Sequence, residues 1–181
     1  MFFWILPVFR QYKSNLFYYF LILALTDPIV HVCYFYFPFI KGPYIYFVSS
    51  LLLYYSIDFS NKKILSNWGR KLILLLILIS AFYFNVDYQL ILAIIHSLIL
   101  YKFIKLLTIK FYHEYKLNLF YLVLVLYELT IVIKMSIVLL KTERGDLFFY
   151  LTLVFEMLIA IFFTIFREDN TKIIFHLKQA S

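Results

Sequence analysis

The 181-residue sequence predicts an all-α fold, a polytopic bundle of six transmembrane helices with short loops. The first observation behind this is composition, because 65% of the residues are hydrophobic, 15% are charged and the mean hydropathy is +0.89. Soluble domains have about 45–50% apolar and about 25% charged residues. Disordered chains are poor in aromatic residues, which make up 23% here. The other two observations are the lengths of the apolar runs and the placement of basic residues between them.

Residues 1–15 form the first segment. Phe2, Phe3 and Trp4 are followed by Arg10 and Lys13, a pattern that predicts an interfacial segment anchored at the lipid headgroups. The segment is not expected to be a cleaved signal peptide, because no positive region precedes the apolar residues and no small-residue cleavage site follows them.

Six apolar runs follow. A membrane helix needs about 20 mostly apolar residues, and single polar interruptions must be tolerated to reach that length here. The predicted spans are Leu16–Phe37, Pro43–Phe59, Lys71–Asn85, Tyr88–Leu107, Leu117–Leu140 and Leu147–Phe166. The second and third are short, so we expect them to stand upright or to thin the bilayer locally. Residues 16–166 thus form one transmembrane domain, and residues 167–181 form a short cytoplasmic tail.

The basic residues predict the orientation, because cytoplasmic loops of membrane proteins carry an excess of Lys and Arg. With the N-terminus inside, the outer loops hold Lys41, Lys141 and Arg144, and Lys134 lies within a span. The inner segments hold Arg10, Lys13, Lys62, Lys63, Arg70, Lys71, Lys102, Lys105, Lys110, Lys116, Arg167, Lys172 and Lys178. This positive-inside asymmetry predicts a multi-pass membrane protein with both termini in the cytoplasm.

Four ionisable residues fall near the middle of their predicted spans: Asp27, His96, Glu128 and Glu156. Because consecutive helices run in alternating directions, we expect these side chains at similar depth, where they can form one buried polar cluster. His31 lies one turn beyond Asp27 on the same face and belongs to the candidate cluster. Ionisable residues within spans are costly and often functional, and burial favours protonated, hydrogen-bonded carboxyl groups.

Each candidate also has a purely structural interpretation. Asp27 precedes Pro28, so its carboxyl can simply satisfy backbone groups freed by a proline kink. Glu128 and Glu156 can each make an inter-helix hydrogen bond, worth about 0.6 kcal/mol on average in membranes. His96 can be a hydrogen-bonded core residue instead of a ligand. Lys134 is expected to extend outward along its own helix face and not to pair with Glu128.

Several kinds of chemistry are missing from the sequence. Cys33 is the only cysteine, so neither an intramolecular disulfide nor a multi-thiolate metal site can form. The sequence has no GxSxG elbow, HExxH helix, glycine-rich phosphate loop or CxxC pair. We therefore expect no metal and no cofactor. The net charge of +7 follows membrane topology and leaves no basic patch for nucleic acid.

The spans rich in Phe, Tyr and Leu, the acid of Thr26-Asp27-Pro28 in the first span and the short loops resemble those of small uncharacterised multi-pass bacterial membrane proteins. Some of these are similar to the membrane input regions of sensor kinases. The resemblance implies a non-enzymatic accessory or sensor-type subunit in the bacterial plasma (inner) membrane. Because no kinase domain follows Phe166 in the sequence, we expect signalling to need a membrane protein partner or a second copy of the chain.

Three functions are therefore open. The first is an accessory or sensor-type subunit that works through a partner protein or a buried apolar ligand. The second is a proton- or ion-coupled membrane protein that uses the midplane Asp, Glu and His residues. The third is an intramembrane enzyme that acts on lipid with the same residues as acid and base. Scattered acids favour the first, and convergence on one cavity favours the other two.

Overall fold

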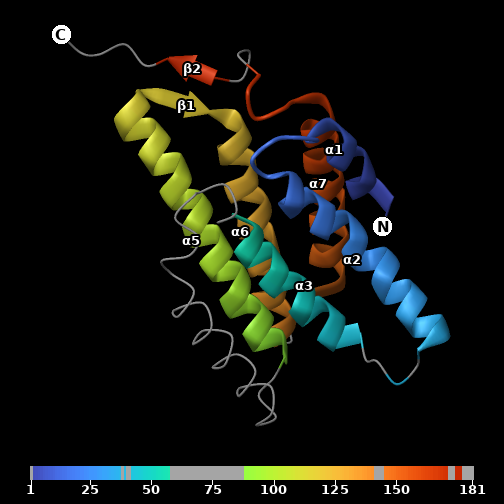
Figure 1. The fold of residues 1–181 in the computed structure, drawn as a ribbon. Coiled ribbons are helices and arrows are strands. Elements are labelled where there is room, and N and C mark those ends of the chain that lie inside the picture. The colour runs from blue at the N-terminus through green and yellow to red at the C-terminus, as the bar shows by residue number, and fades with distance from the viewer. Residues whose placement is uncertain are drawn as a thin grey trace, which may run out of the picture.

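The computed structural model describes residues 2–37, 39, 42–57, 88–140, 145–170 and 174–176. In these residues the chain forms a helical bundle (Figure 1). Its elements are the 3₁₀ helix Phe2–Trp4, the helices α1 (Ile5–Arg10), α2 (Phe17–Tyr36), α3 (Gly42–Ser56), α5 (Tyr88–Glu114), α6 (Leu119–Leu139) and α7 (Gly145–Ile165), and the strands β1 (Lys116–Asn118) and β2 (Ile174–His176).

Four of these helices, α2, α5, α6 and α7, are long and apolar enough to cross a membrane. Helix α3 has 15 residues, which span about 22 Å, short of the hydrocarbon thickness of about 30 Å. The predicted span Lys71–Asn85 lies outside the described residues. The membrane character of the chain therefore rests on four helices, and the six-span count and the orientation stay predictions.

The helices pack in a chain of neighbours, α2 against α3, α3 against α5, α5 against α6 and α6 against α7. Helix α1 contacts both α2 and α7. Figure 1 shows α1, β1 and β2 at one end of the bundle, which we call the terminal end. The last residues of α2 and the first residues of α3 and α5 lie at the opposite end, which we call the distal end.

Large rings fill the bundle interior towards the terminal end. Phe163 packs against Phe20 and Phe120 with ring centroids 4.9 and 5.0 Å apart, and edge-on ring pairs of this kind add about 0.5–1.5 kcal/mol to simple burial. We call this set the aromatic layer: Trp4, Tyr19, Phe20, Phe103, Phe120, Tyr127 and Phe163. Trp4 was expected among headgroups, but its side chain is buried, with its ring 4.7 Å from that of Tyr127. The depth of residues 1–15 in the bilayer stays a prediction.

A short antiparallel ladder departs from the all-α expectation. β1 pairs with β2, with Leu117 opposite Phe175. Tyr115 has a φ of 50° directly after α5, and Asn118 then caps α6 by accepting a hydrogen bond from the Phe120 amide. Lys116–Asn118 are extended, and their backbone pairs with that of Ile174–His176. The ladder ties the segment after α7 to the turn between α5 and α6.

Candidate functional site

A cavity of about 550 Å³ lies among α2, α3, α5, α6 and α7. It extends to the distal end, because Tyr88 and Gln89 begin α5 and Val138 lies in the last turn of α6. Its volume is in the range of small-molecule sites, about 300–1,000 Å³. The lining residues are Asp27, His31, Tyr46, Ser50, Tyr88, Gln89, Leu92, His96, Lys134, Met135, Val138, Phe149, Leu153 and Glu156.

Five polar residues of the site lie at similar depth because of where they fall along their helices. Each is eight to eleven residues from the distal end of its helix, which corresponds to about 12–17 Å at 1.5 Å per residue. Half the thickness of a hydrocarbon core of about 30 Å falls in the same range. The residues concerned are Asp27 of α2, Ser50 of α3, His96 of α5, Glu128 of α6 and Glu156 of α7.

A chain of hydrogen bonds, which we call the relay, runs from the cavity wall into the core through Ser50, His96, Glu128 and Tyr19. Ser50 Oγ lies 3.2 Å from His96 Nε2, and His96 Nδ1 lies 2.9 Å from Glu128 Oε2. The Tyr19 hydroxyl donates to Glu128 Oε1. Glu128 and Tyr19 are 0% exposed, and Ser50 and His96 are 4% and 6% exposed. The relay therefore joins four helices, and its Ser50–His96 end faces the cavity.

Two protonation states of the relay satisfy its hydrogen bonds with an ionised Glu128. In one, neutral His96 donates a hydrogen bond from Nδ1 to Glu128 and accepts a hydrogen bond from the Ser50 hydroxyl at Nε2. In the other, a protonated His96 donates from both nitrogens, to Glu128 and to Ser50 Oγ. In the second state the imidazolium is the counter-charge of the buried carboxylate. The two differ by one proton, so the geometry allows the relay to take up and release a proton at the cavity wall.

Lys134 and Glu156 form an ion pair on the cavity wall. Lys134 Nζ lies 3.2 Å from Glu156 Oε1, and their side chains are only 20% and 13% exposed. The ammonium also lies 4.4 Å from the centre of the Phe149 ring, a favourable cation–π contact. The prediction that Lys134 extends outward is wrong, because Glu156 on α7 supplies a buried counter-charge that the sequence of α6 alone does not show.

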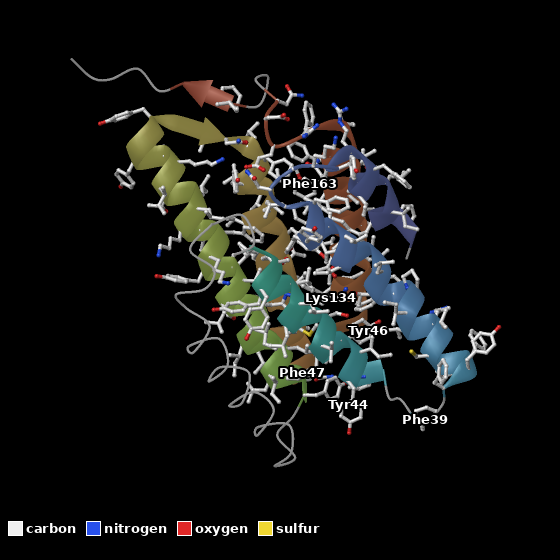
Figure 2. The ribbon with its side chains drawn as sticks, in the orientation of Figure 1. Phe39, Tyr44, Tyr46, Phe47, Lys134 and Phe163 are labelled. Carbon is white, nitrogen blue, oxygen red and sulfur yellow. The ribbon has the colours of Figure 1, made fainter. Side chains whose placement is uncertain are left out.

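Asp27 faces the cavity from the middle of α2, where its carboxyl accepts a hydrogen bond from Tyr46 of α3. Figure 2 shows Tyr46 and Lys134 in the same middle part of the bundle, and Phe163 nearer the terminal end. His31 also lines the cavity. Tyr34, about one turn beyond His31 on α2, is 77% exposed. Helix α2 runs without a break through Pro28, and a bend at this residue stays a prediction.

All five candidate residues therefore meet in one place. Asp27, His31, His96 and Glu156 line the cavity, and Glu128 reaches it through His96. Sequence reasoning missed Tyr19, Tyr46 and Ser50, since hydroxyl-bearing residues are common in membrane helices and carry no charge to mark them. The one available signal was the Ser49–Ser50 pair inside an apolar run.

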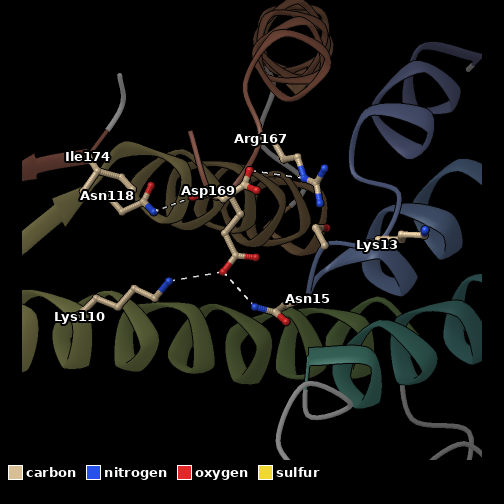
Figure 3. A pocket seen from close by; sticks show the side chains of 9 residues that line it. Lys13, Asn15, Lys110, Asn118, Arg167, Asp169 and Ile174 are labelled. Atoms are coloured by element: carbon tan, nitrogen blue, oxygen red, sulfur yellow. Dashed lines mark hydrogen bonds and ion pairs between the residues drawn. The ribbon is translucent and has the colours of Figure 1, made fainter. Parts of the chain in front are cut away.

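A second polar pocket, of about 300 Å³, lies at the terminal end (Figure 3). Its centre is Glu168, whose carboxylate accepts hydrogen bonds from Lys110, Asn15 and Tyr121. Asn118 donates to the backbone oxygen of the same residue at 3.1 Å. Because these partners occupy both the side chain and the backbone of Glu168, we interpret the pocket as an anchor for the segment after α7.

Within the described residues, no group of three or more His, Cys, Asp and Glu side chains could hold a metal ion. The relay and the ion pair both border the cavity and supply acid, base and ionic contacts. In comparisons with known proteins, no family, curated sequence or solved structure matches this chain.

Proposed function

We propose that this is a proton-linked membrane protein, which holds a small polar ligand in its intramembrane cavity and exchanges a proton there. The observation that carries the proposal is convergence. Asp27, His96, Lys134 and Glu156, from four different helices, line one cavity. Ionisable residues within membrane segments that face a cavity mark ion and substrate pathways, proton relays and ligand counter-ions.

The charges of the wall support a polar ligand over an apolar one. The Lys134–Glu156 pair offers a cation and an anion side by side, and Asp27 with Tyr46 adds a second acid on α2. A ligand with both a positive and a negative group can contact all of these without leaving a buried charge unpaired. An apolar ligand would desolvate these groups further and offer them no polar contact in return. This favours proton or ion coupling over an accessory subunit that holds an apolar ligand.

Two kinds of group can exchange the proton. Asp27 is a carboxyl on the cavity wall, and His96 is a base whose charged form is stabilised by Glu128. The other groups that face them are His31 and Tyr19 on α2, Tyr46 on α3, Lys134 on α6 and Glu156 on α7. Since Glu156 already has Lys134 as its counter-ion, we assign proton exchange to Asp27 and the His96–Glu128 pair.

The test is infrared difference spectroscopy of the full-length protein in lipid as the pH is changed. The carbonyl stretch of a protonated carboxyl in an apolar setting should appear at low pH, vanish at high pH, and be lost in Asp27→Asn. The matched control is Asp169→Asn, because Asp169 is outside the cavity and its side chain is 73% exposed. Equal spectra for Asp27→Asn and the unmodified protein would exclude Asp27 as a proton-exchanging group.

A further inference from the structure

We infer that Ser50 is an activated nucleophile, with His96 as its general base and Glu128 as the residue that positions the imidazole, so that the cavity hydrolyses carboxylic esters. The inference goes beyond proton exchange and shares with it only the requirement that a small molecule can enter the cavity. It rests on the order of the three groups, Ser50 at the wall, His96 behind it and Glu128 deepest.

The geometry is that of an activated serine. A nucleophilic hydroxyl needs a base within about 2.6–3.2 Å, and the base must itself be oriented by a third group. Ser50 Oγ lies 3.2 Å from His96 Nε2, and the opposite ring nitrogen lies 2.9 Å from Glu128. Tyr19 donates to the other carboxylate oxygen, which fixes Glu128 from the far side. Such an arrangement is recognised by geometry and not by chain order or fold.

The neighbouring hydroxyl shows that this arrangement is specific to one serine. Ser49 precedes Ser50 on α3 and is also buried, at 8% exposed, but the cavity wall includes Ser50 and not Ser49. Consecutive helical residues point about 100° apart. Burial alone therefore does not single out Ser50; its contact with both the cavity and His96 does.

The cavity wall indicates the substrate class. Leu92, Met135, Val138 and Leu153 form an apolar part that suits a short acyl chain. The Lys134–Glu156 pair and Asp27 suit a polar or zwitterionic head. Tyr46, Gln89 and Lys134 bring side-chain N–H and O–H groups to the same cavity, and such donors can stabilise the negative oxygen that forms when a carbonyl is attacked. We assign the substrate as an ester of an amphipathic molecule with a short acyl chain.

The reaction balances with ester and water alone. Ser50 Oγ attacks the carbonyl carbon and its proton passes to His96 Nε2. The tetrahedral intermediate breaks the bond to the alcohol oxygen, which takes that proton from His96 and leaves as the alcohol, with the acyl group on Ser50. Water then attacks the acyl carbon and gives a proton to His96. The acyl–serine bond breaks, Ser50 regains the proton and the carboxylic acid leaves.

The test uses a fluorophosphonate probe on the full-length protein in lipid nanodiscs, with the modified residue located by mass spectrometry. We expect labelling of Ser50, loss of this labelling in Ser50→Ala, and an unchanged rate in the matched control Ser49→Ala. His96→Gln should slow labelling by at least about 100-fold, the usual contribution of a general base. Glu128→Gln should slow it by at least about 10-fold, since it disturbs the orientation of the base. Hydrolysis of p-nitrophenyl butyrate should follow the same order.

Absence of the Ser50 adduct in the folded protein, or labelling that survives in Ser50→Ala, would overturn the inference. If Ser50→Ala does not fold, Ser50→Cys in a Cys33→Ser background replaces it, and iodoacetamide must then alkylate residue 50 faster when His96 is present than in His96→Gln. An inert Ser50 together with an Asp27 carbonyl band that titrates would refute the nucleophile and keep the proton-linked function. A labelled Ser50 without that band would refute proton exchange at Asp27 and keep the nucleophile.

Discussion

Glu128 shows how much one buried side chain can organise. It lies on α6, accepts a hydrogen bond from Tyr19 of α2 and contacts His96 of α5, which in turn contacts Ser50 of α3. A carboxylate that is 0% exposed must have such partners, because an unpaired buried charge is very costly. The same contacts that satisfy Glu128 therefore fix the orientation of the imidazole that faces the cavity.

We predict that Glu128→Gln moves the proton of His96 from Nδ1 to Nε2. A carboxylate can only accept a hydrogen bond from Nδ1, whereas a glutamine amide that accepts from Tyr19 must present its NH₂ group to the imidazole. Nitrogen-15 NMR of selectively labelled histidine distinguishes the two tautomers. Nδ1 should be protonated in the unmodified protein at every pH, and unprotonated in Glu128→Gln at high pH. An unprotonated Nδ1 in the unmodified protein would contradict the ionised Glu128 described above.

We predict that Lys134 and Glu156 are energetically coupled. Lys134→Met should destabilise the protein because it leaves Glu156 without its counter-charge, and adding Glu156→Gln should restore part of the loss. The coupling free energy should be about 1–3 kcal/mol, as for contacting charged residues. Unfolding of the four proteins of this double-mutant cycle in mixed detergent measures it. A coupling near zero would mean that the 3.2 Å contact contributes nothing to stability.

At this scale the sequence predicted the charged members of the site and not the neutral ones. Asp27, His96, Glu128 and Glu156 interrupt apolar runs, and the cost of burying charge marks them. Ser50 and Tyr19 are polar enough to build the relay. Because a neutral hydroxyl costs much less free energy in a membrane helix than a charge does, such residues occur widely there and do not mark a site. The partner of Lys134 was missed because pairing between helices depends on which faces meet, which the pattern of one helix does not reveal.

Among the elements, α1 illustrates how a short terminal helix can be part of the bundle. The Gln11 amide follows α1 and donates to the Phe163 and Phe166 carbonyls at 2.9 and 2.8 Å. The Phe163 carbonyl lies in the last turn of α7 and Phe166 directly follows the helix, a region where backbone acceptors have no partner within the helix. Gln11 is 0% exposed. It therefore acts as a C-terminal cap supplied by another element.

We predict that Gln11→Leu destabilises the protein by about 2 kcal/mol, the cost of leaving buried carbonyl groups without a donor. The loss should be accompanied by faster amide hydrogen exchange in the last turn of α7. Phe9→Ala is the control, since Phe9 lies on α1 but is 75% exposed, and it should change the unfolding free energy by less than about 0.5 kcal/mol. Equal effects of the two substitutions would argue against the cap.

The long elements were the easiest to predict and the terminal ones the hardest. The predicted spans that begin at Leu16, Leu117 and Leu147 correspond to α2, α6 and α7 with ends that differ by one or two residues. Apolar runs of membrane length fix these boundaries. Helix α5 continues to Glu114, seven residues beyond the predicted end, because a helix need not stop where its residues become polar. The β1–β2 ladder joins segments of three residues each, too short to give a periodic signal.

The whole molecule has the same order of layers along each long helix. A terminal-pocket residue comes first, then a ring of the aromatic layer, then a residue of the cavity or relay. The sets are Asn15, Phe20 and Asp27 for α2; Lys110, Phe103 and His96 for α5; Asn118, Phe120 and Glu128 for α6; and Arg167, Phe163 and Glu156 for α7. Two polar sites are thus separated by packed rings, and the cavity is approached from the distal end.

We predict that solutes enter the cavity from outside the cell. In a Cys33→Ser background, a membrane-impermeant thiol reagent applied to intact cells should modify Met135→Cys, which lies on the cavity wall. It should modify Asp169→Cys only after permeabilisation, because the basic residues predict a cytoplasmic terminal end. Leu158→Cys, 59% exposed and expected to face lipid, is the control that should not react in either case. Modification of Asp169→Cys in intact cells would reverse the predicted orientation.

The aromatic layer also has an electrical consequence. A membrane potential falls most steeply across the region that neither water nor mobile ions can reach, and between the two polar sites that region is the layer around Phe20, Phe120 and Phe163. Water in the cavity would keep Asp27 and His96 near the potential of the distal solution. Voltage would then hardly shift their protonation, whereas a charge carried past the rings would cross most of the field, at about 2.3 kcal/mol per 100 mV.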